Sequence, residues 1–194
     1  TDRSRGLGDV YKRQVYIVRY AVLDWGPTLL GEWKGVSIHH AGWMVAAFEI
    51  SGIVGMLVAG WATDRFFGGR GPRVCVICMA LATVFVALFW GISQPPMWLA
   101  TLLLGAAGFC IYGPQALVGI AAANIATKKA AATAVGFTGL FGYASTLVSG
   151  WGLGLLAQHY GWNIAVGALI LIAIMGTLIF MAAWSAKANG YDND

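Results

Sequence analysis

The chain has 194 residues, of which 59% are hydrophobic and only 10% are charged, and its formal net charge is +4. This composition excludes an ordinary soluble domain. The positive charge does not indicate nucleic-acid binding, because the basic residues form short clusters between apolar runs and do not line one face.

The first 14 residues, TDRSRGLGDVYKRQ, hold four of the twelve Lys and Arg residues and show no apolar periodicity. They resemble translated sequencing-adapter read-through, so we expect residues 1–14 to be a non-native leader. The alternative is a basic cytoplasmic linker in front of a membrane helix, which fits the positive-inside rule equally well.

Six apolar segments follow, and a membrane span needs about 20 such residues. They cover residues 15–30, 43–62, 74–92, 97–125, 130–157 and 162–184. The fourth contains Gly113-Pro114, which predicts a kink, and the last has a tryptophan at each end, as in interfacial belts. We expect an all-α membrane protein, with six transmembrane helices in residues 15–186 and a tail at 187–194.

Charge in the loops predicts the orientation of these spans. The basic residues lie in every second loop and after the last span. The loop after the second span holds Arg65, Arg70 and Arg73, the loop after the fourth holds Lys128 and Lys129, and Lys187 follows the sixth span. The intervening loops hold Lys34 and no other Lys or Arg. The positive-inside rule therefore places the arginine-rich loop and the C-terminus in the cytoplasm. His39, His40 and His159 fall in or beside the outward loops, and we interpret them as surface residues.

Arg19 lies inside the first span, in YIVRYAVLDW at residues 16–25. A guanidinium in hydrocarbon costs about 2.5–3.5 kcal/mol even on lenient insertion scales. Tyr16 and Tyr20 flank it, whereas Asp24 lies roughly 140° round the helix. Because no neighbour neutralises its charge and its planar fork suits phosphate, we expect Arg19 to bind a phosphate group. A snorkelling interfacial arginine is the alternative.

Glu49 interrupts the second span and should face the protein interior. We favour a partner role with Arg19, and a protonated carboxyl bonded to the backbone is the alternative. Cys75, Cys78 and Cys110 all lie in apolar runs. The Cys75-x-x-Cys78 spacing has no second pair and no nearby histidine, so we interpret these residues as buried thiols and expect no metal.

The most specific local motif is GWATDRFFGGRGPR at residues 60–73. A positive-inside loop explains its arginines but not the Gly-x-x-x-Asp-Arg order. The motif resembles the G-x-x-x-D-R-x-G-R loop of the major facilitator superfamily, with extra residues before the second basic cluster. The resemblance implies a conformational loop whose residues are Gly60, Asp64, Arg65, Arg70 and Arg73.

Other segments resemble one branch of that superfamily, the organophosphate:phosphate antiporters. They are Y-x-x-R-Y at 16–20, DWGPT at 24–28, GFCIYGP at 108–114, KKA at 128–130 and GFTGLFGY at 136–143. The resemblance implies the C-terminal six-helix half of a twelve-helix transporter in a bacterial inner membrane. The missing N-terminal half would then be its partner.

The resemblance also implies roles for single residues. Arg19 would bind phosphate together with an arginine of the absent half. The residues that would line the substrate cavity are Tyr16, Tyr112, Thr138 and Tyr143. Asp24 and Glu49 would take part in charge switching around the substrate.

By the same resemblance, the protein exchanges an organic phosphate for inorganic phosphate by alternating access, without a cofactor. Hexose-phosphate members tend to carry Asp and Lys where this chain has Val135 and Thr138, whereas glycerol-phosphate members share GFTGLFGY. Glycerol 3-phosphate is therefore the expected substrate. The alternatives are a hexose-phosphate transporter and a non-transporting phosphate-ester sensor of the same fold. An integral membrane enzyme is disfavoured, because catalytic histidines or paired acids at an interface are missing.

Overall fold

A computed structural model of the protein describes residues 2–125, 131–182 and 184. Within these ranges the side chains of residues 2–14, 33 and 122–125, and of several α5 positions, lie outside the described set. The six helices are α1 (Asp2–Lys34), α2 (Ile38–Phe66), α3 (Gly71–Gly91), α4 (Met97–Ile125), α5 (Ala131–Tyr160) and α6 (Trp162–Ala182). The expected all-helical fold is confirmed for this part of the chain. Lys128, Lys129 and Lys187 lie outside it.

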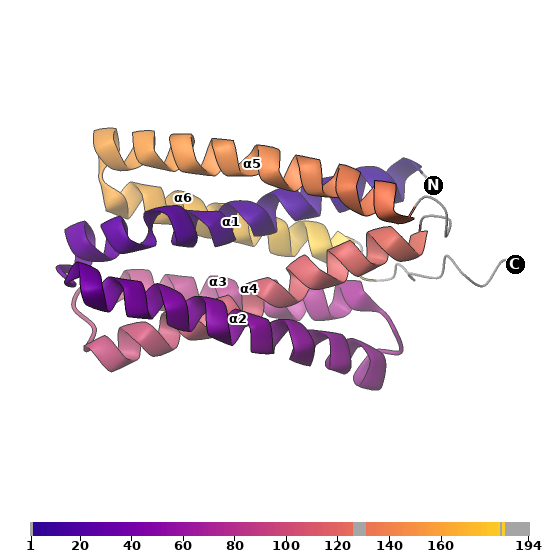
Figure 1. Ribbon diagram of the computed structural model, residues 1–194, viewed down its shortest axis with the longest axis horizontal. Coiled ribbons are helices and arrows are strands. Elements are labelled where there is room, and N and C mark those ends of the chain that lie inside the picture. Colours follow the sequence, from indigo (N-terminus) through magenta and orange to yellow (C-terminus); the bar gives the residue numbers. More distant parts are fainter. Residues whose placement is uncertain (1, 126–130, 183, 185–194) are drawn as a thin grey trace, which may run out of the picture.

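In the described part of the chain, four helices are long and apolar enough to cross a membrane: Ile38–Phe66, Gly71–Gly91, Met97–Ala121 and Trp162–Ala182. Helix α1 is less apolar because Arg19, Asp24 and Glu32 lie within it. Figure 1 shows α1 and α5 running alongside the other helices. Large apolar side chains cover the outer faces, with Leu57 67% and Trp151 75% exposed. Such surfaces are a liability in water and ordinary in a bilayer.

The first two helices extend further than the apolar segments predicted. Helix α1 runs from residue 2 to 34 where a span of 15–30 was expected, and α2 begins at residue 38 where 43 was expected. An apolar run marks only the part of a helix that lies in lipid, because backbone hydrogen bonding continues through polar ends. Gly35 (φ 67°) ends α1 with a bond from Val36 N to Leu30 O of 3.0 Å, and Ser37 caps α2.

Glycines make the turn between α2 and α3. Gly68 and Gly69 have φ of 54° and 75°, in the left-handed region that suits glycine. The Gly69 N–H donates to the Thr63 carbonyl at 3.0 Å, which folds the turn back on α2. The motif at residues 60–73 therefore contains a tight turn that is shorter than the motif. Asp64 and Arg65 lie in the last turn of α2, and Arg73 lies in the first turn of α3.

The helix pairing has an internal symmetry. Helix α2 packs on α4, α1 packs on α5, and α3 contacts both α4 and α6. If α1, α2 and α3 are matched in order to α4, α5 and α6, the α2–α4 contact corresponds to the α5–α1 contact. Because each group has three helices, the two groups run in opposite directions, as inverted repeats do. In Figure 1, α1, α5 and α6 lie on one side and α2, α3 and α4 on the other.

The α2–α4 contact is close enough to bring the two backbones together. A Cβ at Gly55 would collide with the backbone of Phe109. The Ser51 hydroxyl crosses the same interface and donates to the Gly105 carbonyl at 2.7 Å. Small residues that allow such approach are typical of helix packing in membranes. This contact fixes the spacing between the α2 and α4 side chains that form the site described next.

Candidate functional site

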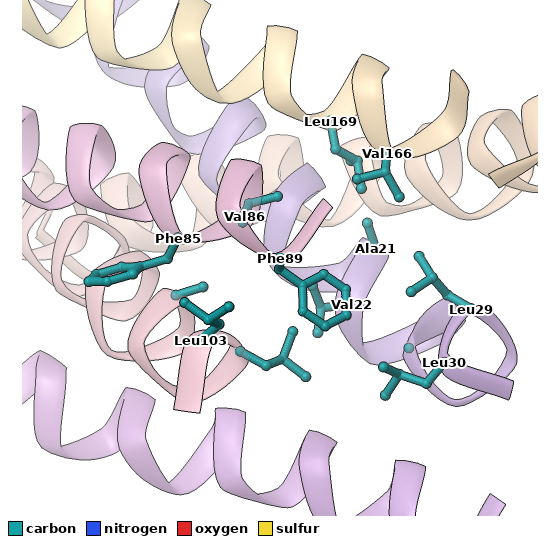
Figure 2. A pocket seen from close by; sticks show the side chains of 13 residues that line it. Ala21, Val22, Leu29, Leu30, Phe85, Val86, Phe89, Leu103, Val166 and Leu169 are labelled. Atoms are coloured by element: carbon teal, nitrogen blue, oxygen red, sulfur yellow. The ribbon is translucent and has the colours of Figure 1, made fainter. Parts of the chain in front are cut away.

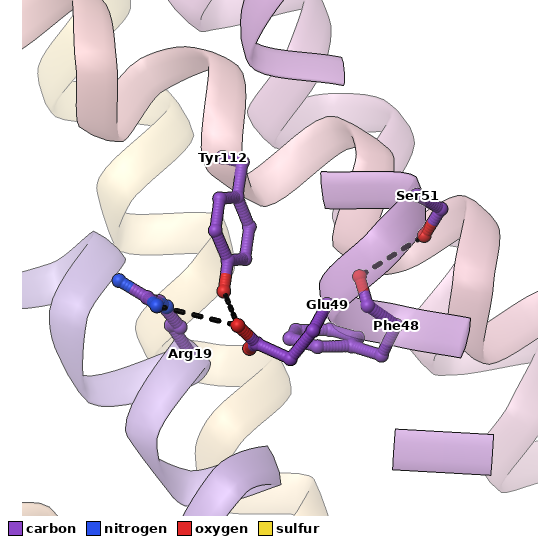
Figure 3. A network of polar contacts seen from close by, with 5 residues as sticks. All are labelled: Arg19, Phe48, Glu49, Ser51 and Tyr112. Atoms are coloured by element: carbon purple, nitrogen blue, oxygen red, sulfur yellow. Dashed lines mark hydrogen bonds and ion pairs between the residues drawn. The ribbon is translucent and has the colours of Figure 1, made fainter. Parts of the chain in front are cut away.

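The two charged side chains predicted to pair do meet inside the bundle. Arg19 of α1 and Glu49 of α2 lie with Nη2 and Oε2 3.5 Å apart, and their side chains are 18% and 32% exposed (Figure 3). Charge-assisted hydrogen bonds are usually about 2.7–2.9 Å long. The pair is therefore a loose contact between two partly buried charges on different helices.

Tyr112 of α4 contacts both members of this pair. Its hydroxyl donates to Oε2 of Glu49, the atom that also faces Arg19. The Arg19 guanidinium carbon lies 4.3 Å from the centre of the Tyr112 ring, within cation–π range. Figure 3 shows the three side chains converging from α1, α2 and α4. Tyr112 thus holds the carboxylate and the guanidinium in one cluster.

The cluster has hydrogen-bonding capacity that the protein leaves unused. Arg19 Nε and Glu49 Oε1 are buried and have no hydrogen-bond partner among the described residues. A buried polar group without a partner is costly, and a charged one more so. These two atoms therefore mark a place where a polar ligand or water would be stabilised.

Aromatic side chains surround the guanidinium on the α1–α5 side. The Arg19 guanidinium carbon lies 5.3 Å from the Tyr20 ring centre. The Tyr143 ring of α5 lies 6.0 Å from that of Tyr16 and 6.3 Å from that of Tyr20, and Tyr143 is 60% exposed. Of the three predicted tyrosines, Tyr112 contacts Arg19 directly, whereas Tyr16 and Tyr143 contact Tyr20 and each other.

Two other predicted residues are not part of this cluster. Asp24 is exposed on α1, and no ion-pair partner for it is found among the described residues. Its Oδ2 faces α5, 4.0 Å from where a Cβ on Gly150 would be. The side chain of Thr138 lies outside the described residues.

The residues of the predicted conformational loop lie apart from the site. Asp64 and Arg65 are exposed, and within the described chain no ion pair joins them or Arg70 to another residue. Gly60 has open space around it. Arg73 stacks under Trp184, with its guanidinium carbon 5.5 Å from the ring centre.

The cysteines and histidines form no centre in the described residues. Cys75 and Cys110 are buried, and all three thiols are free. No group of three or more His, Cys, Asp or Glu side chains in this part of the chain could hold a metal ion. His39 and His40 are exposed in the first turn of α2.

A narrow cavity of about 40 Å³ lies deeper in the bundle, between α1, α3, α4 and α6. Its lining is apolar and includes Leu30, Phe89 and Leu169 (Figure 2). A phosphate would find no hydrogen-bond donor there. The polar cluster at Arg19 is therefore the candidate site.

Sequence reasoning missed Gly52, which lies one turn after Glu49 on α2. A Cβ there would lie 2.5 Å from Cδ2 of Tyr112, so the glycine gives the ring its place. The spacing Glu49-x-x-Gly52 was visible, but only the structure shows which α4 side chain fills the space.

Comparison with known proteins agrees with this picture. The Major Facilitator Superfamily profile matches residues 16–190. A crystal structure of the peptide transporter POT superposes with a TM-score of 0.71 at 13% identity, covering 94% of this chain and 38% of that one. The chain belongs to the Major Facilitator Superfamily and is an integral membrane protein.

Its curated relatives are named for phosphorylated metabolites or for sensing. A probable hexose phosphate transport protein of Chlamydia pneumoniae is 39% identical over 89% of this chain and 38% of its own length. The glycerol-3-phosphate transporter of Bacillus subtilis is 36% identical over 88% and 39%. The membrane sensor protein UhpC of Escherichia coli is 35% identical over 82% and 36%.

These relatives confirm the resemblance to the organophosphate:phosphate antiporter branch. The chain spans less than half the length of these three relatives: its matches cover between 36% and 39% of their sequences.

Proposed function

We propose that this chain is the C-terminal six-helix half of a secondary transporter that exchanges an organic phosphate for inorganic phosphate. The observation that carries the proposal is Arg19: a partly buried guanidinium with one buried N–H unpaired and a counter-ion 3.5 Å away on another helix. A guanidinium held this loosely can exchange its carboxylate for a phosphate, which offers it two parallel hydrogen bonds.

Binding of phosphate would rearrange the cluster in a defined way. A phosphate at Arg19 would meet the negative charge of Glu49, so the carboxylate must move away or take up a proton. The Tyr112 hydroxyl, which now donates to Glu49, would then be free to donate to the phosphate. When the site empties, Glu49 pairs with Arg19 again. Asp24, exposed on α1, would meet charges of the opposing half.

Alternating access would require the second six-helix half of the transporter. The second six-helix bundle would supply another arginine and close the cavity, and the two bundles would rock about the bound phosphate. We place the turn at residues 67–70 and the C-terminus in the cytoplasm of a bacterial inner membrane, because the arginines cluster at that end.

Glycerol 3-phosphate is the substrate that we favour. Residues 136–143 read GFTGLFGY, and Thr138 offers one neutral hydroxyl where a lysine would add a charged donor for sugar hydroxyls. A pocket with fewer hydrogen-bonding groups suits a short three-carbon phosphate better. Similarity to both hexose-phosphate and glycerol-3-phosphate transporters keeps a hexose phosphate as the second candidate.

A phosphate-ester sensor is the competing function, because the sensor UhpC is 35% identical to the chain. A transporter and a sensor would both need Arg19 to bind the phosphorylated ligand. Only a transporter would exchange labelled phosphate across a liposome membrane when the complete protein is reconstituted.

The experiment that tests the role of Arg19 is its replacement by lysine in the complete protein. Arg19→Lys keeps the positive charge but loses the planar fork, so we expect most phosphate binding to be lost. Isothermal titration of inorganic phosphate into the purified variant measures this. Phosphate affinity close to that of the unchanged protein would contradict the assignment.

A further inference from the structure

Arg73 has an environment that the transport site does not explain. Its guanidinium lies under the Trp184 indole, with 5.5 Å between the guanidinium carbon and the ring centre. Its Nε is buried, and among the described residues it has neither a hydrogen-bond partner nor an ion-pair partner. A cation covered by an indole but without an anion remains open to a negatively charged ligand.

The position of this pair along the bundle matches the surface of a bilayer. Helices α3 and α6 each have 21 residues, which is about 30 Å of helix and the thickness of the hydrocarbon core. Arg73 lies in the first turn of α3, and Trp184 follows the end of α6. Both residues therefore lie at the same end of the bundle, at the depth where lipid headgroups begin and where tryptophan is enriched.

A groove lies beside this pair, between α3 and the end of α6. It has a volume of about 260 Å³ and is lined by Val76, Met181 and Trp184. Val76 lies one turn after Arg73, so the cation and the apolar groove are adjacent on α3. The neighbouring outer surface is apolar, with Ile77 41% and Leu178 58% exposed.

We propose that the groove between α3 and α6 binds one anionic phospholipid, with the phosphate on Arg73 and an acyl chain along Val76 and Met181. Charge complementarity selects this occupant, because an acyl chain alone would leave the guanidinium unpaired. A free phosphate would leave the groove empty. Only a phospholipid fills both parts. The proposal is independent of the transported substrate.

The test uses the complete protein, purified in detergent and mixed with equal amounts of phosphatidylglycerol and phosphatidylcholine. Native mass spectrometry counts the lipids that each variant retains. Arg73→Gln should lower the ratio of bound phosphatidylglycerol to phosphatidylcholine by about fivefold, the effect expected of one basic residue near an anionic lipid. Val76→Trp should fill the groove and lower retention of both lipids.

Two further variants keep the result interpretable. Arg65→Gln removes a basic residue that is exposed at the same end of the bundle and touches no part of the groove, so the lipid ratio should not change. Arg73→Lys keeps the charge and should keep the preference for phosphatidylglycerol, which separates loss of charge from misfolding.

Three outcomes would overturn the proposal. An equal loss in Arg65→Gln and Arg73→Gln would show a diffuse basic surface. Displacement of bound phosphatidylglycerol by millimolar inorganic phosphate would show that the site binds free phosphate. Higher lipid retention after deletion of residues 185–194 would show that this segment, and not lipid, occupies the groove in the complete chain.

Discussion

At the residue scale, the geometry of the charged cluster depends on a residue that carries no charge. Gly52 is buried on α2, one turn after Glu49. The Tyr112 ring occupies the space that a side chain at position 52 would fill. A Cβ on residue 52 would lie 2.5 Å from Cδ2 of the ring. This close approach directs the Tyr112 hydroxyl to Glu49 and the ring face to Arg19.

We predict that Gly52→Ala displaces the Tyr112 ring and breaks its hydrogen bond to Glu49. Forcing a methyl group into a packed contact costs about 1–3 kcal/mol of stability. Thermal unfolding of the complete protein measures this cost, and inorganic phosphate titration measures the effect on the site.

The matched control is Gly42→Ala, on the same helix, where a Cβ would meet nothing within 4 Å. This variant should leave both measurements unchanged or raise the melting temperature slightly, because alanine favours helix. If Gly52→Ala behaves like Gly42→Ala, Tyr112 is not positioned by this contact.

At the element scale, one indole gives both a hydrogen bond and a close packing contact between α1 and α5. The Trp25 N–H donates to the Gly150 carbonyl at 3.0 Å, and the edge of the ring lies against Gly154. The opposite face of the bundle has a counterpart in the α2–α4 contact at Gly55. The α1–α5 and α2–α4 pairs, which the internal symmetry relates, thus each include close contacts at glycines.

We predict that Gly154→Ala loosens α1 from α5, because a Cβ there would lie 2.7 Å from Cζ2 of Trp25. The indole must shift and lose its hydrogen bond, which contributes about 0.5–1.5 kcal/mol net. A lower melting temperature is the expected result. Gly152→Ala, where a Cβ meets nothing within 4 Å, serves as the control. Equal melting temperatures for the two variants would contradict the role of this contact.

The extent to which the sequence predicts these elements has a physical explanation. The apolar runs located all six helices, and the need of a buried charge for a partner suggested the Arg19–Glu49 contact. Helices that are apolar on every side carry little record of which face packs inward. The Gly52–Tyr112 and Trp25–Gly154 contacts depend on how each helix is rotated about its axis. The sequence therefore could not predict them.

At the scale of the whole molecule, α5 has an exposed aromatic surface next to the tyrosines of the cluster. Tyr143 and Trp151 of α5 are 60% and 75% exposed, and Tyr143 borders Arg19 through the other tyrosines. A substrate held at Arg19 would therefore also touch whatever covers this surface. The substrate preference would therefore be determined by the complete protein.

We predict that glycerol 3-phosphate inhibits phosphate uptake by the complete protein at lower concentration than glucose 6-phosphate. Competition for labelled phosphate uptake into liposomes measures the two half-inhibitory concentrations. Replacing Thr138 by lysine should shift the order towards glucose 6-phosphate, because the added donor can bind sugar hydroxyls. Stronger inhibition of the unchanged protein by glucose 6-phosphate would reverse the substrate assignment.

The contact between Arg19 and Glu49 also bears on how the protein responds to membrane voltage. The guanidinium and the carboxylate together carry no net charge. Each unbalanced elementary charge that crosses the membrane field involves about 2.3 kcal/mol per 100 mV. While this pair is formed, the two residues together give the empty site no net charge on which the membrane potential can act, whereas an unpaired Arg19 would respond to the sign of the potential. In the proposed exchanger, Glu49 would thus limit the effect of voltage on the empty site between the release of one phosphate compound and the binding of the next.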